Sequence, residues 1–283
     1  MRTVENTAVM WNAVMTGRKA EYAFGTGRAQ GGRRVAISCE MIWKGNLILV
    51  NERYPYRAET EAVWLSSPFS DQPQHLMACE ASSALAGLLR SLQAGKRIVG
   101  VSGLRSMEEQ ICIWNDSEKE NGLEFTRKFV AVPGHSEHQT GLAMDVALNQ
   151  KQIDFICPQF PYEGICQEFR ELSADFGFIE RYPAGKEAVT GIGAEPWHFR
   201  YVGIPHARIM KEHSMALEEY VDWLRGFDWN SAPLRYWDEG KEFYIGWIAC
   251  EGKKEVEAIL PKHCRYAVSG NNVDGIIITA AVI

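Results

Sequence analysis

Short apolar runs bounded by Gly, Asn or Pro alternate along the chain with longer segments whose apolar residues recur at helical spacing. Short runs of apolar and β-branched residues are typical of strands, whereas a period of about 3.6 residues is typical of amphipathic helices. We therefore predict strands at residues 47–51, 97–103, 142–148 and 197–203. Helices are predicted at residues 75–93, 163–177 and 205–213. One more helix is expected to begin at Ser106, because Glu109 follows it at capping-box spacing.

The pattern changes beyond about residue 214, where a helical stretch rich in Trp and Tyr precedes a series of strand-like runs. These runs lie at 243–250, 256–261, 264–270 and 275–283. Between the last two, the sequence SGNNVDG has the Asn and Gly content of a hairpin turn. We predict that residues 214–283 form a small appended α/β module.

The first part of the chain lacks any sustained periodicity and is rich in Gly and Arg after Tyr22. We predict a poorly ordered N-terminal extension over residues 1–40 and a main domain over 41–213. A chain of 283 residues is long enough for one such domain and a smaller module.

Composition narrows the class of protein. Hydrophobic residues make up 46% of the chain and charged residues 23%, which is ordinary for a globular protein. The net charge of -6 argues against a nucleic-acid binder, and no apolar stretch approaches the ~18 residues of a membrane span. The seven cysteines form no C-x-x-C pair, which argues against a disulfide framework or a thiolate zinc cluster. We expect free thiols, a cytoplasmic location, and neither nucleic acid nor membrane as a partner.

Two short polar segments carry the residues best suited to chemistry. In GHSEHQTGLAMD, His138 and Asp145 lie on either side of a glycine, so both side chains could face one point. In EPWH, the proline favours an extended backbone before it, so Glu195 and His198 could share one cleft. Taken alone, the first pair is more typical of a loop histidine and a turn-capping aspartate. The second is more typical of a histidine packed among core aromatic residues.

Together the two segments supply two imidazoles and one carboxylate, and Glu195 in addition. Three such ligands with an open fourth position for water are the formula of a catalytic zinc site, beside which a glutamate can act as general base. Arg105 lies between a predicted strand and a predicted helix. Its guanidinium could stabilise an oxyanion or bind a substrate carboxylate, although a surface or ion-paired arginine is the simpler interpretation.

These segments resemble the zinc signature of the VanY/VanX/VanXY family of D-Ala-D-Ala peptidases. The similarity rests on SEHQTGLAMD, on EPWH, and on SGLRS followed by EEQ, where Leu104 stands in place of the usual tyrosine. It covers most of residues 42–283 and is strongest to the VanXY-type D,D-dipeptidase/D,D-carboxypeptidases of vancomycin-resistance clusters. The resemblance implies an α+β fold with a mostly antiparallel central sheet and flanking helices.

Carried over residue by residue, the resemblance implies a Zn²⁺ site formed by His138, Asp145 and His198. It further implies that Glu195 is the catalytic base and that Arg105 stabilises the transition state. Ser136 and Gln110 are expected to bind the substrate near its C-terminal carboxylate. For Glu137 two possibilities stay open, since it could point away from the metal or meet a substrate ammonium.

The expected activity is zinc-dependent hydrolysis of a terminal D-Ala-D-Ala unit, in the free dipeptide, in a muramyl-pentapeptide precursor, or in both. In a resistant bacterium this activity would remove the target of vancomycin. Two alternatives stay open, namely a peptidoglycan endopeptidase of the endolysin type and a non-catalytic zinc-binding module. Retention of Glu195 and Arg105 argues against the second alternative, because a structural zinc site needs neither.

Overall fold

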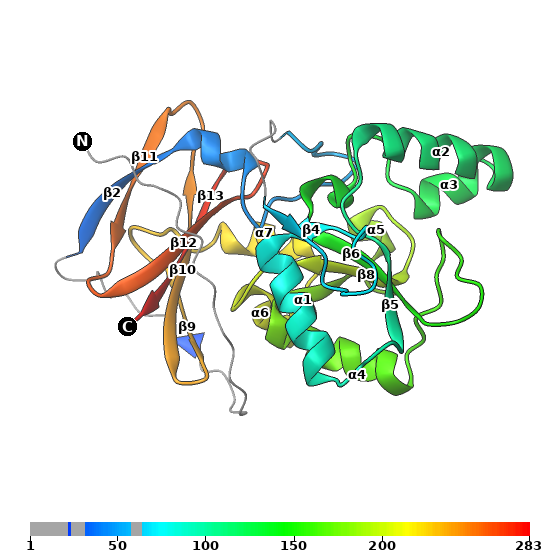
Figure 1. The fold of residues 1–283 in the computed structure, drawn as a ribbon. Helices are drawn as coiled ribbons and strands as arrows, with labels where there is room; N and C mark the ends of the chain where they lie inside the picture. The colour runs from blue at the N-terminus through cyan, green and yellow to red at the C-terminus, as the bar shows by residue number, and fades with distance from the viewer. Residues whose placement is uncertain (1–21, 24–31, 58–63) are drawn as a thin grey trace.

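The centre of the fold is a four-stranded antiparallel sheet with the strand order β5-β6-β8-β7. The structure is a computed structural model that describes residues 22–23, 32–57 and 64–283 (Figure 1). The four strands are β5 (Ile98–Ser102), β6 (Ala143–Leu148), β7 (Phe178–Tyr182) and β8 (Glu195–Tyr201). β5, β6 and β8 coincide with predicted strands, and the antiparallel pairing agrees with the expected α+β fold.

Helices flank this sheet and bury its apolar face. Leu85 of α1 (Cys79–Ser91) and Phe169 of α4 (Gly164–Ser173) belong to the same buried cluster as Phe199 of β8. The rings of Phe169 and Phe199 pack with their centroids 4.7 Å apart. The other helices are α2 (Met107–Asn121), α3 (Leu123–Phe129), α5 (Glu187–Thr190), α6 (His206–His213) and α7 (Leu217–Leu224). The short elements are β3 (Leu65–Ser66), β4 (Met77–Ala78) and the 3-10 helices η1 (Cys39–Trp43), η2 (Glu137–Thr140) and η3 (Ala174–Phe176).

The C-terminal strands and the N-terminal β1 form a second antiparallel sheet with the order β1-β9-β10-β13-β12, and β11 pairs with the N-terminal β2 beside it (Figure 1). These strands are β1 (Tyr22–Ala23), β2 (Arg33–Ser38), β9 (Leu234–Asp238), β10 (Lys241–Ala249), β11 (Glu255–Leu260), β12 (Cys264–Gly270) and β13 (Gly275–Val282). β12 and β13 pair as the predicted hairpin. Ile179 of β7, Val221 of α7 and Ile277 of β13 share one hydrophobic core, which therefore crosses residue 214. The division into a main domain and a module stays a prediction.

Part of the predicted N-terminal extension is an ordered strand. Residues 33–38 form β2, which pairs with β11 from Arg33 opposite Leu260 to Ser38 opposite Glu255. The prediction of a poorly ordered extension is therefore wrong for these residues, because a distant strand supplies the pairing that local periodicity did not reveal. Residues 1–21 and 24–31 lie outside the described part of the chain.

The predicted strand at 47–51 is also wrong, although the segment is buried as its apolar character suggested. Side chains and single backbone groups of distant elements satisfy its backbone in place of a neighbouring strand; the Leu49 amide, for example, donates to the Asn271 carbonyl oxygen over 3.1 Å. Ser269 Oγ accepts a hydrogen bond from the Leu47 amide, and Arg200 donates to the Ile48 carbonyl oxygen. An apolar run predicts burial more reliably than it predicts the partner of its backbone groups.

The predicted start of α2 and the predicted end of the α4 segment agree closely with the structure, whereas the helix predicted from residue 75 begins only at Cys79, because Met77–Ala78 form β4. Ser106 caps α2 and forms the predicted capping box with Glu109, whose amide lies 3.1 Å from the serine hydroxyl. Gly177 ends the helical segment of α4 and η3 with a φ of 81°. Within the described ranges, none of the helices has both the length and the apolar character needed to cross a bilayer.

Candidate metal centre

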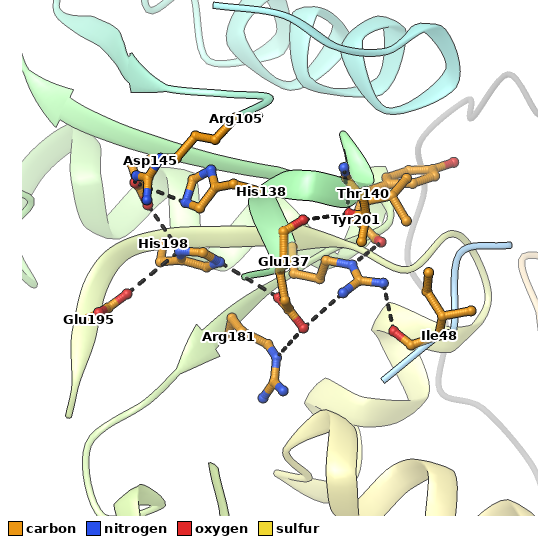
Figure 2. Close-up of polar contacts among 12 residues, drawn as sticks. Ile48, Arg105, Glu137, His138, Thr140, Asp145, Arg181, Glu195, His198 and Tyr201 are labelled. Carbon is orange, nitrogen blue, oxygen red and sulfur yellow. Dashed lines mark hydrogen bonds and ion pairs between the residues drawn. The ribbon is translucent and has the colours of Figure 1, made fainter. Parts of the chain in front are cut away.

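Three neighbouring strands place one polar residue each in a single row. Asp145 of β6 is paired directly with Ser102 of β5 on one side and with His198 of β8 on the other. Directly paired residues of antiparallel strands point to the same face of the sheet. His198 Nδ1 consequently lies 3.0 Å from Asp145 Oδ1, and both side chains are buried (Figure 2).

His138 approaches this row from the segment before β6. It lies on η2, which ends at Gly141 in a left-handed conformation with a φ of 71° that favours glycine. His138 Nδ1 lies 2.7 Å from the Gly103 carbonyl oxygen, and its Nε2 lies 3.1 Å from Asp145 Oδ2. A carbonyl oxygen can only accept, so Nδ1 carries the proton and Nε2 directs its lone pair at the carboxylate.

The donor atoms of these three residues fit a metal cation. His138, Asp145 and His198 offer ligand atoms that all lie within 4.8 Å of one another. Burial lowers the pKa of His138 to about 4, so its imidazole is neutral at pH 7. Burial alone would raise the pKa of Asp145, but its contacts with neighbouring groups, the charged His198 among them, hold it well below its usual range. A neutral imidazole lone pair and a carboxylate oxygen therefore face each other, and a cation between them would satisfy both.

Glu195 begins β8 and lies beside the metal-binding candidates. Its Oε2 is 3.6 Å from His198 Nδ1, and its side chain is buried. The pairing of β7 with β8 shifts register between Glu180 and Tyr182, next to this residue. Such an irregularity re-aims side chains, which explains how Glu195 and His198, three positions apart on a strand, both face the site. Burial raises the pKa of Glu195 to about 8.

Of the three other predicted site residues, Arg105 and Ser136 line the pocket beside this centre, whereas Gln110 does not. Arg105 donates from Nη2 to Asp145 Oδ2 over 2.7 Å and from Nε to Ser102 Oγ over 2.7 Å. Ser136 is buried and lines the pocket that opens onto the metal-binding candidates. Gln110 does not line it, because its amide donates to a backbone carbonyl and accepts from Arg105 Nη1 over 3.4 Å. Gln110 therefore lies behind Arg105.

The rest of this pocket is mostly apolar. Its lining also includes Ile113, Phe129, Val130, Ala131, Phe155, Ile156, Tyr182, Ile192 and Trp197. Phe155 lies under the guanidinium of Arg105, with the guanidinium carbon 5.5 Å from the ring centre. Apolar side chains therefore surround a wall that is mainly polar, which suits a small substrate whose reacting group must be held by that wall.

Sequence reasoning missed an ion cluster behind His198. Glu137 Oε2 faces His198 Nε2 at 3.6 Å, and Glu137 Oε1 lies 2.8 Å from both Arg181 and Arg200 (Figure 2). The side chains of Glu137 and of both arginines are fully buried. Of the two possibilities for Glu137, the contacts favour a carboxylate engaged by Arg181 and Arg200 behind His198, although the residue also contributes to the lining of the pocket. The available signal was an arginine in each of two short segments rich in aromatic residues, FIERY and WHFRY, because an arginine that is buried in a strand requires a partner.

The family of the chain follows from its similarity to known proteins. The sequence profile of the VanY family, described as D-alanyl-D-alanine carboxypeptidase, matches residues 74–204. The bifunctional D-Ala-D-Ala dipeptidase and D-Ala-D-Ala carboxypeptidase VanXYC of Enterococcus gallinarum is 43% identical over 180 residues, which are 63% of this chain and 94% of that protein. The chain belongs to the VanY family of peptidases. The predicted family is thereby confirmed.

Two solved structures relate the fold to the members of this family. VanXYg, a vancomycin-resistance D,D-dipeptidase in complex with a D-Ala-D-Ala phosphinate analog, matches with a TM-score of 0.83 and 43% identity, over 88% of this chain and 98% of that chain. A mutant of the D,D-pentapeptidase VanY from a VanB-type resistance cassette, in complex with Zn(II), matches with a TM-score of 0.51 and 32% identity, over 62% of this chain and 99% of that chain. The predicted fold class is therefore confirmed.

Proposed function

We propose that the chain is a zinc-dependent D,D-peptidase that hydrolyses a terminal D-Ala-D-Ala unit and so contributes to vancomycin resistance. The convergence of His138, Asp145 and His198 beside Glu195, at the polar wall of one pocket, carries the proposal. The relatives support the substrate class, because VanXYC acts on D-Ala-D-Ala as dipeptidase and carboxypeptidase and VanXYg binds a D-Ala-D-Ala analog.

The proposed zinc ligands are His138 Nε2, the Asp145 carboxylate and His198 Nδ1. Two imidazole nitrogens and a carboxylate oxygen suit Zn²⁺, and a related VanY enzyme holds Zn(II). Zinc bound there would polarise the scissile carbonyl and lower the pKa of a water molecule. Burial alone would lower the pKa of His198, but Asp145 raises it to about 9. Zinc binding at pH 7 is therefore expected to release the proton that His198 holds in the metal-free protein.

Glu195 is proposed as the general base. Burial raises the pKa of Glu195 to about 8 in the metal-free protein, and the charge of bound zinc would lower it, so that the carboxylate could accept a proton from water and pass it to the leaving amine. The Arg105 guanidinium is proposed to stabilise the developing oxyanion. Ser136 is proposed to bind the substrate carboxylate, and Gln110 to contribute to substrate binding by holding Arg105 in place.

We further propose that the reaction takes place in the cytoplasm on soluble precursors. All seven cysteines are free thiols, which is the usual state of cysteines in a reducing compartment. The proposed substrates are the free D-Ala-D-Ala dipeptide and the muramyl-pentapeptide precursor.

Release of D-Ala from these two substrates, with and without zinc, tests the proposal. The Glu195→Gln variant should lose roughly 10²- to 10⁴-fold in kcat/KM while it still binds zinc. Glu168→Gln, an equivalent change at an exposed position of α4, should behave like the unmodified chain. Near-normal activity of Glu195→Gln, or zinc-independent release, would refute the proposed mechanism. Cleavage of intact cell wall without release of D-Ala from either substrate would favour the endopeptidase alternative.

A further inference from the structure

The buried ion cluster behind His198 extends into α7, which belongs to the C-terminal part of the chain. Arg181 donates from Nη1 to Glu218 Oε2 over 2.8 Å and from Nη2 to Glu218 Oε1 over 2.6 Å. The same guanidinium donates from Nε to Glu137 Oε1 over 2.8 Å. One arginine therefore connects a carboxylate of α7 with the carboxylate that faces His198 Nε2.

The cluster is electrically balanced and almost dry. It contains two arginines, Arg181 and Arg200, and two carboxylates, Glu137 and Glu218. The first three side chains are fully buried, and Glu218 is 13% exposed. Removing one member would leave an uncompensated charge in the interior, where charges interact strongly. The position of each charged group therefore depends on the others.

Glu218 is also held by Asn51, which shares one of its carboxylate oxygens with Arg181. Asn51 Nδ2 donates to Glu218 Oε1 over 3.1 Å, and the Asn51 carbonyl oxygen accepts a hydrogen bond from His135 Nδ1 over 2.7 Å. His135 lies three positions before the metal-binding candidate His138 in the same loop. Glu218 thus contacts the surroundings of the metal centre through two separate routes, one through Arg181 and one through Asn51.

We propose that Glu218 is a positioning residue of the metal centre. Through Arg181, Glu218 keeps the Glu137 carboxylate beside Nε2 of His198, the imidazole nitrogen that does not face Asp145. This inference rests on the proposed zinc site. A metal-binding histidine is oriented by the acceptor that faces its other nitrogen, and such acceptors strongly affect metal affinity. Here Glu137 Oε2 faces His198 Nε2 at 3.6 Å, an ion-pair contact that is longer than a hydrogen bond. Without Glu218, Arg181 loses the partner of both terminal nitrogens and competes with His198 for Glu137. The cluster also gains one net positive charge beside a cation site, which weakens cation binding.

Zinc affinity, measured by competition with a chromophoric chelator, tests this role directly. Glu218→Gln should weaken zinc binding roughly 10- to 100-fold. Glu219→Gln is the matched control, since the next residue of α7 pairs at the surface with Lys186 over 2.8 Å and is 35% exposed. This variant loses the same charge and should keep the zinc affinity of the unmodified chain.

A second variant and a second measurement separate positioning from general stability. Glu218→Asp keeps the charge, and its zinc affinity should lie between those of Glu218→Gln and the unmodified chain; it carries the test if Glu218→Gln does not fold. A purely structural role would lower the unfolding midpoint of the metal-free protein and leave the zinc affinity of the folded protein unchanged, which would overturn the inference. If the unmodified chain binds no zinc, the proposed function fails, and this inference fails with it.

Discussion

Asn272 joins the β12–β13 hairpin to the buried segment near residue 50, and its replacement by Ala should destabilise the fold by about 4 kcal/mol. Its amide nitrogen donates to the carbonyl oxygens of Leu49 over 2.8 Å and Pro55 over 2.9 Å, and the residue is 3% exposed. Two buried acceptors without partners cost about 3 kcal/mol together. The backbone φ of 60° adds about 1 kcal/mol, because Asn tolerates the left-handed region better than Ala does.

Urea unfolding of the metal-free protein, followed by tryptophan fluorescence, measures this loss. Asn272→Gly removes the same hydrogen bonds without the conformational penalty, so it should cost about 3 kcal/mol. Asn115→Ala, on the exposed face of α2, serves as a control and should cost less than about 1 kcal/mol. A loss below about 1 kcal/mol for Asn272→Ala, or a larger loss for the Gly variant than for the Ala variant, would refute the reasoning.

Three further predictions concern pH, backbone packing and the oxyanion. Burial lowers the pKa of His206 to about 3, so the unfolded chain takes up a proton first below pH ~6.5, and this residue alone should remove about 2 kcal/mol of stability from pH 7 to pH 5. Urea unfolding at the two pH values should therefore show a change in unfolding free energy that is about 2 kcal/mol less favourable on acidification for the unmodified chain than for His206→Gln. At Gly270 an added Cβ would lie 2.1 Å from the Ile42 carbonyl oxygen, so Gly270→Ala should lose about 2 kcal/mol or more in thermal unfolding. Gly252→Ala, with open space around it, should lose only about 1 kcal/mol, and equal losses would contradict the packing argument. Lysine lacks the fork that lets Arg105 contact Ser102 and Asp145 together, so Arg105→Lys should lower kcat/KM for D-Ala release roughly 100-fold, and unchanged kinetics would exclude this role.

The metal-binding candidates could be predicted because each is conspicuous in its own short segment. Asp145 is the single charge in an apolar run, and the structure places it in the middle of a sheet. Glu137 could not be understood in this way, since its partners Arg181 and Arg200 lie on strands far along the chain. The same limit explains the error at 47–51, whose backbone partners include a side chain more than two hundred positions away. The local sequence pattern therefore identifies the candidate reactive side chains, whereas their hydrogen-bond and ion-pair partners come from distant parts of the chain and cannot be read from it.

Because Asp145 of β6 pairs directly with His198 of β8, the length of these two strands is fixed, whereas the loops that connect them to other elements can vary in length. A single inserted residue in β6 or β8 would turn one of the proposed ligands to the opposite face of the sheet. Part of the pocket wall is free of this constraint on length. Phe155 and Ile192 line the pocket from the segments 149–163 and 183–194, which connect elements of the sheet layer. These connections can lengthen or shorten without moving a ligand. Insertions and deletions there are consequently the most direct route by which evolution or engineering could change the accepted peptide while the reaction stays the same.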